Sequence, residues 1–189
     1  MRPDGIPSGS SREPLARLFF ALWPPLALAT ELHSRAINLA SQCGGRVMRC
    51  DTLHLTLAFL GEVRNERIPR IRAAADQLDG RSFPLLIDQL GFWPHNRILW
   101  AGSATISRQA EELAANLAMA LKHFVEWPTR KEARPFVPHL TLIRNVAEST
   151  PVLPPLPPLS WQCDRFVLVR SQRSNHGADY KTIGEWRLR

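Results

Sequence analysis

The chain has 189 residues, of which 44% are hydrophobic and 22% are charged. This length predicts one substantial core, and the ordinary balance of apolar and charged residues excludes a largely disordered chain. The formal net charge of +7 favours polyanionic ligands such as nucleic acid, although improved solubility alone would also explain it.

The three cysteines predict reduced thiols rather than a disulfide framework. Cys43, Cys50 and Cys163 are odd in number and show no CxxC spacing, in a chain long enough to need no covalent staples. We therefore expect a cytoplasmic protein.

An apolar run at residues 18–29 follows several arginines and partly resembles an export signal. Pro24 and Pro25 interrupt any apolar helix there, and the run is shorter than the ~20 residues that span a bilayer. It is interpreted as a buried strand that turns into a helix, with no membrane partner.

The remaining elements follow from periodicity and turn residues. Residues 1–14 are rich in proline, glycine and serine and predict a disordered tail, which leaves one domain at 15–189. In chain order, the patterns predict a strand at 18–23, a helix at 25–42, a strand at 53–60, a helix at 68–78, paired strands at 83–90 and 97–101, a helix at 107–125, a strand at 136–143, an extended connection at 151–158, and strands at 161–171 and 180–188. Short strands mixed with helices indicate an α+β fold with antiparallel sheets.

The tetrapeptide His-Leu-Thr-Leu occurs twice, at His54–Leu57 and at His139–Leu142. The copies begin at residues 54 and 139, a separation of 85 residues that suggests duplication into two lobes. Because side chains alternate along a strand, each copy buries two leucines and presents one imidazole beside one hydroxyl.

If the two strands face each other across a cleft, the site holds a general acid, a general base and two hydroxyl donors. Those groups suffice to break a phosphodiester without a metal. Of the other histidines, His95 lies beside Trp93 and, like Tyr180, is a candidate to reach a ligand bound in the cleft. Core or surface positions are the default interpretation for His33, His95, His123 and His176.

The flanks of the two motifs extend the pattern. Residues 17–25 (RLFFALWPP), 53–61 (LHLTLAFLG), 97–102 (RILWAG) and 134–142 (RPFVPHLTL) resemble the two-histidine (2H) phosphoesterase superfamily. Within it, they are similar to the RNA 2′,3′-cyclic phosphodiesterases. The resemblance runs from about residue 17 to the C-terminus in family order.

The resemblance implies residue roles and a fold. His54 would be the proton donor and His139 the proton acceptor, with Thr56 and Thr141 binding the phosphate. It further implies a bilobal fold, with two antiparallel sheets and outer helices around a central cleft, and no metal cofactor. Arg134, just upstream of the second motif, is added here as a phosphate contact.

The expected substrate is RNA with a 2′,3′-cyclic phosphate end, or a nucleotide cyclic phosphate, opened to a 2′-phosphomonoester, with 2′-5′ RNA ligation as a related reversible activity. No obligate protein partner is indicated. Three alternatives stay open: a 2H hydrolase of 2′-5′ oligonucleotides or nucleotide-derived cyclic phosphates, an RNA-end binding module without turnover, and a zinc site of both histidines and a cysteine. The zinc site lacks ligand spacing and a carboxylate.

Overall fold

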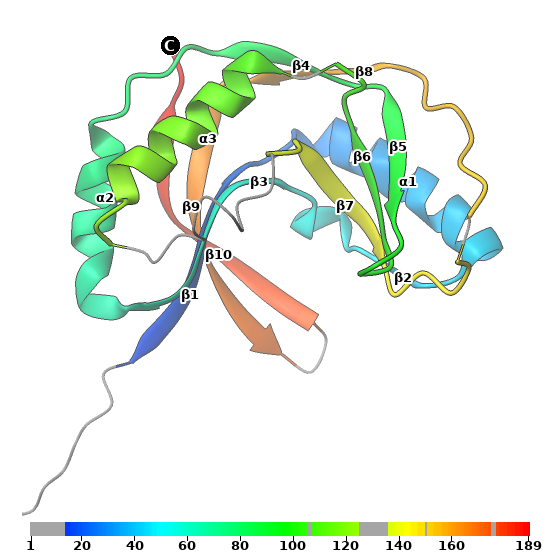
Figure 1. Ribbon diagram of the computed structural model, residues 1–189, viewed down its shortest axis with the longest axis horizontal. Helices are drawn as coiled ribbons and strands as arrows, with labels where there is room; N and C mark the ends of the chain where they lie inside the picture. The colour runs from blue at the N-terminus through cyan, green and yellow to red at the C-terminus, as the bar shows by residue number, and fades with distance from the viewer. Residues whose placement is uncertain (1–13, 106, 125–135, 150, 175–176) are drawn as a thin grey trace, which may run out of the picture.

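The computed structural model describes residues 14–105, 107–124, 136–149, 151–174 and 177–189. Of the predicted tail, only Pro14 lies within the described residues. Two lobes lie side by side in Figure 1, one containing α2 (Ile68–Asp76) and α3 (Arg108–Leu121), the other α1 (Leu26–Cys43). The bilobal α+β arrangement predicted from the sequence is confirmed.

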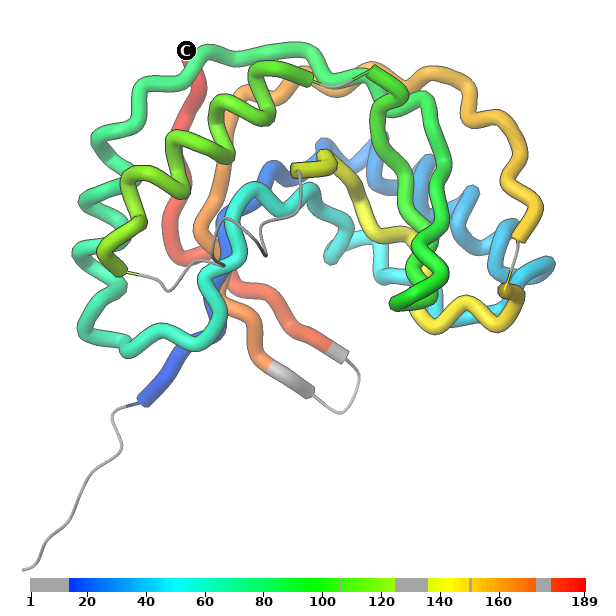
Figure 2. Tube along the Cα trace, viewed as in Figure 1, coloured from blue at the N-terminus to red at the C-terminus, as the bar shows by residue number. Residues whose placement is uncertain are grey.

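Most strands belong to one antiparallel sheet of order β10-β9-β1-β3-β7-β6-β5, with β2 beside β7. The bounds are β1 Leu15–Leu22, β2 Arg46–Val47, β3 Leu55–Arg64, β4 Phe83–Ile87, β5 Gln89–Trp93, β6 Ile98–Gly102, β7 His139–Arg144, β8 Leu159–Cys163, β9 Arg165–Ser174 and β10 Gly177–Arg187, with short 3₁₀ turns at Cys50–Thr52 and Asn65–Arg67. A single residue pair, Leu55 with Leu140, joins β3 to β7. Within the described residues, the sheets of the two lobes are therefore continuous only at this point. Figure 2 shows the arched course of the chain over the two lobes.

The helix ends follow the local sequence signals. Pro24 and Pro25 stop β1, and α1 begins at Leu26, so residues 18–29 are the end of a strand and the start of a helix, as predicted. Gly44 ends α1 with φ +67°, a conformation that favours glycine, and its N–H donates to the Ala40 carbonyl at 2.8 Å. Within the described residues, no helix is long and apolar enough to cross a membrane.

A serine side chain caps the N-terminus of α3. The Ser107 hydroxyl accepts a hydrogen bond from the Ala110 N–H at 3.3 Å, which satisfies one of the free donors of the first turn. The buried face of α3 carries Ala110, Leu113, Ala114, Leu117 and Leu121.

Two predicted strands are wrong in their extent and pairing. The run 83–90 is divided at Asp88: β4 pairs with β8, and only β5 pairs with β6. The Asp88 carboxylate accepts from the Ala104 N–H at 2.7 Å, which fixes the chain where it leaves one sheet for the other. The run 161–171 is divided in the same way at Asp164, between β8 and β9. The alternation lapses at both aspartates, where the exposed Gln89 and Arg165 take the next positions of the buried face, but the lapse does not say with which strand each half pairs.

The core lies between the sheet and the helices. It includes all four leucines of the duplicated motif, Leu55, Leu57, Leu140 and Leu142. The alternation predicted for the motif strands is therefore observed on their buried side, which leaves the histidines and threonines for the opposite face.

Candidate active site

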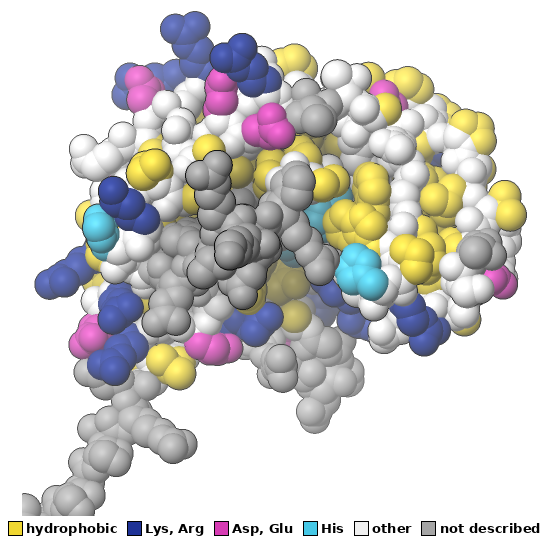
Figure 3. Space-filling view, viewed as in Figure 1, with side chains coloured by type: hydrophobic (Ala, Val, Ile, Leu, Met, Phe, Trp, Pro, Cys, Tyr) yellow, Lys and Arg dark blue, Asp and Glu magenta, His cyan; other side chains and the backbone are white. Residues whose placement is uncertain are grey.

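Both motifs line one cavity of about 200 Å³. The cavity lies where β3 and β7 are neighbours in the sheet. It is lined by Met48, Thr52, His54, Thr56, Trp93, Asn96, Ile98, His139, Thr141 and Arg144. Four of the five predicted site residues are thus brought together, and the fifth, Arg134, lies outside the described residues. Figure 3 shows the hollowed face, where histidine side chains lie among hydrophobic ones and Lys and Arg follow the lower rim.

Each histidine is held by the same local hydrogen bond. The Nδ1 of His54 lies 2.7 Å from the carbonyl oxygen of Thr52, and the Nδ1 of His139 lies 2.8 Å from that of Val137. Because a carbonyl only accepts, Nδ1–H is the donor in both rings, and this fixes the tautomer. Nε2 is therefore the nitrogen left to take or give a proton in each motif.

Aromatic side chains surround both imidazoles. The ring centroid of His54 lies 4.8 Å from that of Phe19, 5.3 Å from that of Trp23 and 5.3 Å from that of Tyr180. His139 lies 4.5 Å from Trp93 by the same measure. These contacts exclude water from the rings and lower the dielectric around them.

The pKa of both histidines is lowered, chiefly because burial disfavours the charged form. For His54 the pKa falls to about 4, with the Arg144 and His139 charges adding to the shift and the hydrogen bond to Thr52 opposing it. At neutral pH the ligand-free site therefore holds two neutral imidazoles. An anionic phosphate in the cavity would raise the pKa of the imidazoles, so substrate binding can lead the acid to take up a proton from solvent.

Arg144 lines the cavity although the sequence interpretation gave it no role. Simple alternation from His139 and Thr141 would turn Ile143 toward the cavity and Arg144 away. In β7, Thr141 pairs with Trp100 and Ile143 with Leu99, so Leu142 is an extra, bulged residue. The bulge reverses the alternation: Ile143 is buried in the core and Arg144 faces the cavity. No residue type in this segment indicates the bulge.

The other residues considered from the sequence divide between the site and the scaffold. Tyr180 contacts His54 edge-on, whereas His95 is exposed in the turn after β5 and does not line the cavity. The Nδ1 of His33 bonds the Met48 carbonyl at 2.9 Å, a structural role. His123 is exposed at the end of α3, and His176 lies outside the described residues.

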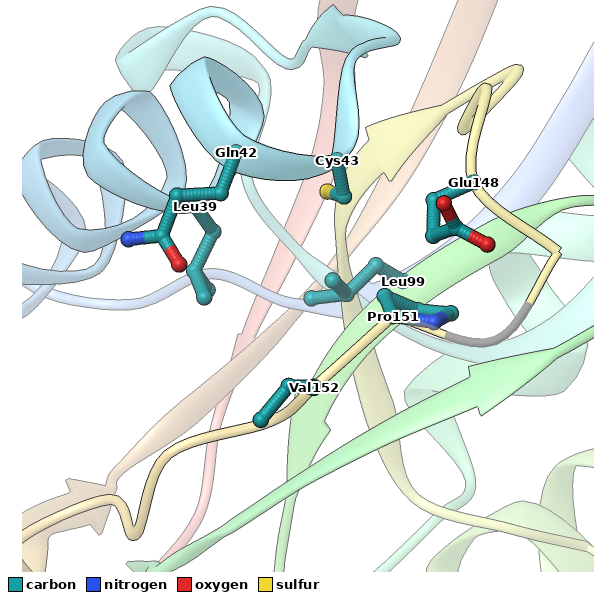
Figure 4. Close-up of a pocket in the computed structure, with 7 residues that line it drawn as sticks. All are labelled: Leu39, Gln42, Cys43, Leu99, Glu148, Pro151 and Val152. Carbon is teal, nitrogen blue, oxygen red and sulfur yellow. The ribbon is translucent and has the colours of Figure 1, made fainter.

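A second cavity, of about 230 Å³, lies beside the C-terminal end of α1 (Figure 4). Gln42 and Cys43 of α1 contribute to it, opposite Leu99 of β6 and Val152. Burial raises the pKa of the Cys43 thiol, which keeps the group neutral. Its titratable side chains are Cys43 and Glu148, with no histidine beside them, so the cavity of the two motifs, with its two imidazoles, is the candidate active site. Across the described residues, no cluster of three or more His, Cys, Asp or Glu side chains is arranged to hold a metal ion.

Comparisons with known proteins find similar sequences over most of the chain. The family model for LigT-like phosphoesterases matches residues 22–100. An RNA 2′,3′-cyclic phosphodiesterase of Escherichia coli K12 is 32% identical over 173 residues, covering 91% of this chain and 96% of the relative. One from Thermus thermophilus is 30% identical over 184 residues, covering 92% of this chain and 90% of the relative.

The solved structures extend the likeness to the fold. The crystal structure of E. coli LigT in apo form superposes with a TM-score of 0.80 at 31% identity, covering 93% of this chain and 98% of that one. The E. coli LigT structure complexed with 3′-AMP also gives a TM-score of 0.80, at 30% identity and covering 93% and 99%. The duplicated motif, the bilobal fold and the similarity over nearly the whole chain show that this protein belongs to the LigT-like phosphoesterase family.

Proposed function

We propose that this protein hydrolyses RNA 2′,3′-cyclic phosphate ends to 2′-phosphomonoesters by metal-independent acid–base catalysis with His54 and His139. The observation that carries the proposal is the matched hydrogen bonding of the two rings, each by Nδ1, in one small cavity that is also lined by the threonines of both motifs. Support comes from relatives named RNA 2′,3′-cyclic phosphodiesterase and from a LigT structure that contains 3′-AMP.

The chemistry requires groups on opposite sides of phosphorus. Water attacks the cyclic phosphate in line with the P–O3′ bond, so the base and the acid must stand at opposite apical positions. In the proposed roles, His139 takes the proton of the water and His54 gives one to the departing O3′. Each such transfer is typically worth ~10² to 10⁴ in rate.

The equatorial oxygens of the phosphorane carry the growing negative charge. The hydroxyls of Thr56 and Thr141 can donate hydrogen bonds to them, and the Arg144 guanidinium adds a positive charge on the same cavity wall. Arg134 is proposed as a further phosphate contact. If the 5′-hydroxyl of another RNA replaces water as the nucleophile, the same proton transfers form a 2′-5′ linkage, which accounts for reversible ligation.

The proposal also covers the substrate class, the domain and the cellular compartment of the enzyme. Its substrate class is RNA with a cyclic phosphate end, and it acts as one domain at residues 15–189, while the tail predicted at residues 1–14 lies outside the described residues except for Pro14. All three cysteines, each within the described residues, are free thiols, which suits the reducing cytoplasm.

The decisive experiment is incubation with RNA that ends in a 2′,3′-cyclic phosphate, followed by phosphorus NMR of the product. A 2′-phosphomonoester is expected. A 3′-phosphate would reverse the roles of the two histidines, and tight binding with no product would favour an RNA-end binding module. Turnover restricted to 2′-5′ oligonucleotides would favour the alternative hydrolase.

A further inference from the structure

His54 lies within an aromatic cage formed by Phe19, Trp23 and Tyr180. The ring planes of Trp23 and His54 are 13° apart, a stacked arrangement, and Phe19 is tilted by 31°. Tyr180 meets both His54 and Trp23 at 87°. The cage comes from three parts of the chain: β1, the residue that follows β1, and β10.

The cage is anchored on the sheet. Ala21 of β1 pairs with Val167 of β9, both are buried, and they form one apolar cluster with Phe19, against which Trp23 and Tyr180 pack. Trp23 therefore packs against this apolar cluster and, edge-on, against Tyr180. This support fixes the orientation of the indole that His54 stacks on.

His139 has a different environment. Its aromatic neighbours, Trp93 and Trp100, are inclined to it by 75° and 68°. Among the described residues, a stacked aromatic partner thus occurs for His54 and not for His139. The two motifs are equivalent in hydrogen bonding but unequal in ring stacking.

Stacking matters because the face of an aromatic ring is negative and attracts a cation placed over it within about 6 Å. An imidazolium on the face of Trp23 gains this attraction, whereas a neutral imidazole gains much less. The gain opposes several unfavourable influences on a charged His54. Arg144 and His139 of β7 repel a positive charge there, and burial disfavours it. The Thr52 carbonyl, the phenol of Tyr180 on β10 and the hydroxyls of Thr56 and Thr141 are further polar groups near His54.

We propose that Trp23 is a positioning residue that holds the His54 ring and stabilises its imidazolium form, so that His54 rather than His139 donates the proton. This inference rests on the proposed function. It adds a residue outside the duplicated motif, and it gives a physical reason why two similar histidines take different roles.

The test compares Trp23→Leu with Trp23→Phe, because Leu and Phe are both apolar and smaller than Trp but only Phe keeps an aromatic face. The alkaline limb of the kcat–pH profile reports ionisation of the acid in the enzyme–substrate complex. We expect this limb to lie about 0.5 to 1 pH unit lower in Trp23→Leu than in Trp23→Phe. At alkaline pH, Trp23→Leu should then turn over about 3- to 10-fold more slowly than Trp23→Phe. The acidic limb should not separate the two variants.

The matched control is the pair Trp93→Leu and Trp93→Phe, which changes the inclined neighbour of His139 and should leave the alkaline limb of its two members equal. If both Trp23 variants lost turnover equally and the alkaline limb stayed at the same pH, Trp23 would only fill space, and the proposal would be overturned. A limb that moves to higher pH in Trp23→Leu would do the same.

A second readout does not depend on turnover. NMR titration of the His54 ring in saturating inorganic phosphate should give a lower pKa in Trp23→Leu than in Trp23→Phe, and equal values would refute the proposal. If the wild-type protein fails to open cyclic phosphates, the proposed function fails, while this titration still decides whether Trp23 stabilises the charged ring.

Discussion

Leu55 and Leu140 form the pair that joins the two lobes of the sheet, and each leucine directly follows the histidine of its motif. Both side chains are fully buried, with 0% exposure. The separation of the two imidazoles is therefore set by backbone pairing at a fully buried point of the sheet. Alternation along the strands keeps the apolar side in the core and the reacting groups in the cavity.

Leu55→Ala should destabilise the fold by about 2 to 5 kcal/mol, because it removes a fully buried side chain and leaves a cavity at the lobe junction. Urea unfolding measures the change. Leu86→Ala is the control, since Leu86 is 43% exposed in β4, and its cost should be far smaller. Similar costs for the two variants would show that the lobe junction is not a stabilising contact.

His54→Ala and His139→Ala should each lower turnover by at least ~10²-fold while the protein stays folded, because each removes one proton-transfer group. Steady-state rates on a 2′,3′-cyclic nucleotide, with circular dichroism as the folding check, measure this. His123→Ala removes an exposed histidine and should keep full activity. Near-normal turnover in either motif variant would rule out the two-histidine mechanism.

Activity should survive dialysis against EDTA, because the proposed reaction needs only proton transfer and hydrogen-bond donors. Rates before and after dialysis, and after addition of zinc, check this expectation. Loss of turnover on chelation that zinc restores would instead favour the zinc site of the two histidines and a cysteine.

Stability should fall as the pH drops from 6.5 toward 4. The pKa of His54 is about 4 in the folded protein and ~6.5 when unfolded, so in this range the unfolded chain binds the proton and the folded one does not. Through this histidine, the free energy of unfolding should be about 2 to 3 kcal/mol lower near pH 4.5 than at pH 7.5. The pKa of His139 is also lowered, so this residue likewise reduces stability as the pH falls.

Urea unfolding of the wild type and of His54→Asn at both pH values isolates the contribution of His54. The variant should lose less stability on acidification, because asparagine does not titrate. An identical pH dependence in the two proteins would show that His54 has an ordinary pKa.

Arg144→Gln should lower kcat/KM by about 10- to 100-fold through loss of a charge at the phosphate, while Arg144→Lys should retain part of it. The pKa of both histidines should rise in Arg144→Gln, since the arginine charge lowers them. NMR titration of the two rings checks this, and unmoved pKa values would place the guanidinium away from the site.

Affinity for a short cyclic-phosphate RNA should weaken modestly with salt.

The sequence by itself determined the parts that depend on near neighbours. The two His-Leu-Thr-Leu copies show by their alternation that leucines are buried and that His54 and His139 face the other side, and the structure agrees. Ser107 and Gly44 mark helix ends because capping involves only adjacent backbone groups. The α+β class follows from the same local periodicities.

Only the tertiary structure decided which distant segments meet. Periodicity does not say that β4 leaves its neighbour β5 to pair with β8, nor that a bulge at Leu142 turns Arg144 into the cavity. It also gives no sign that Trp23 stacks on His54 rather than joining the core. These features arise where backbones from remote parts of the chain come together, and the free energy of that pairing is not encoded in any one segment.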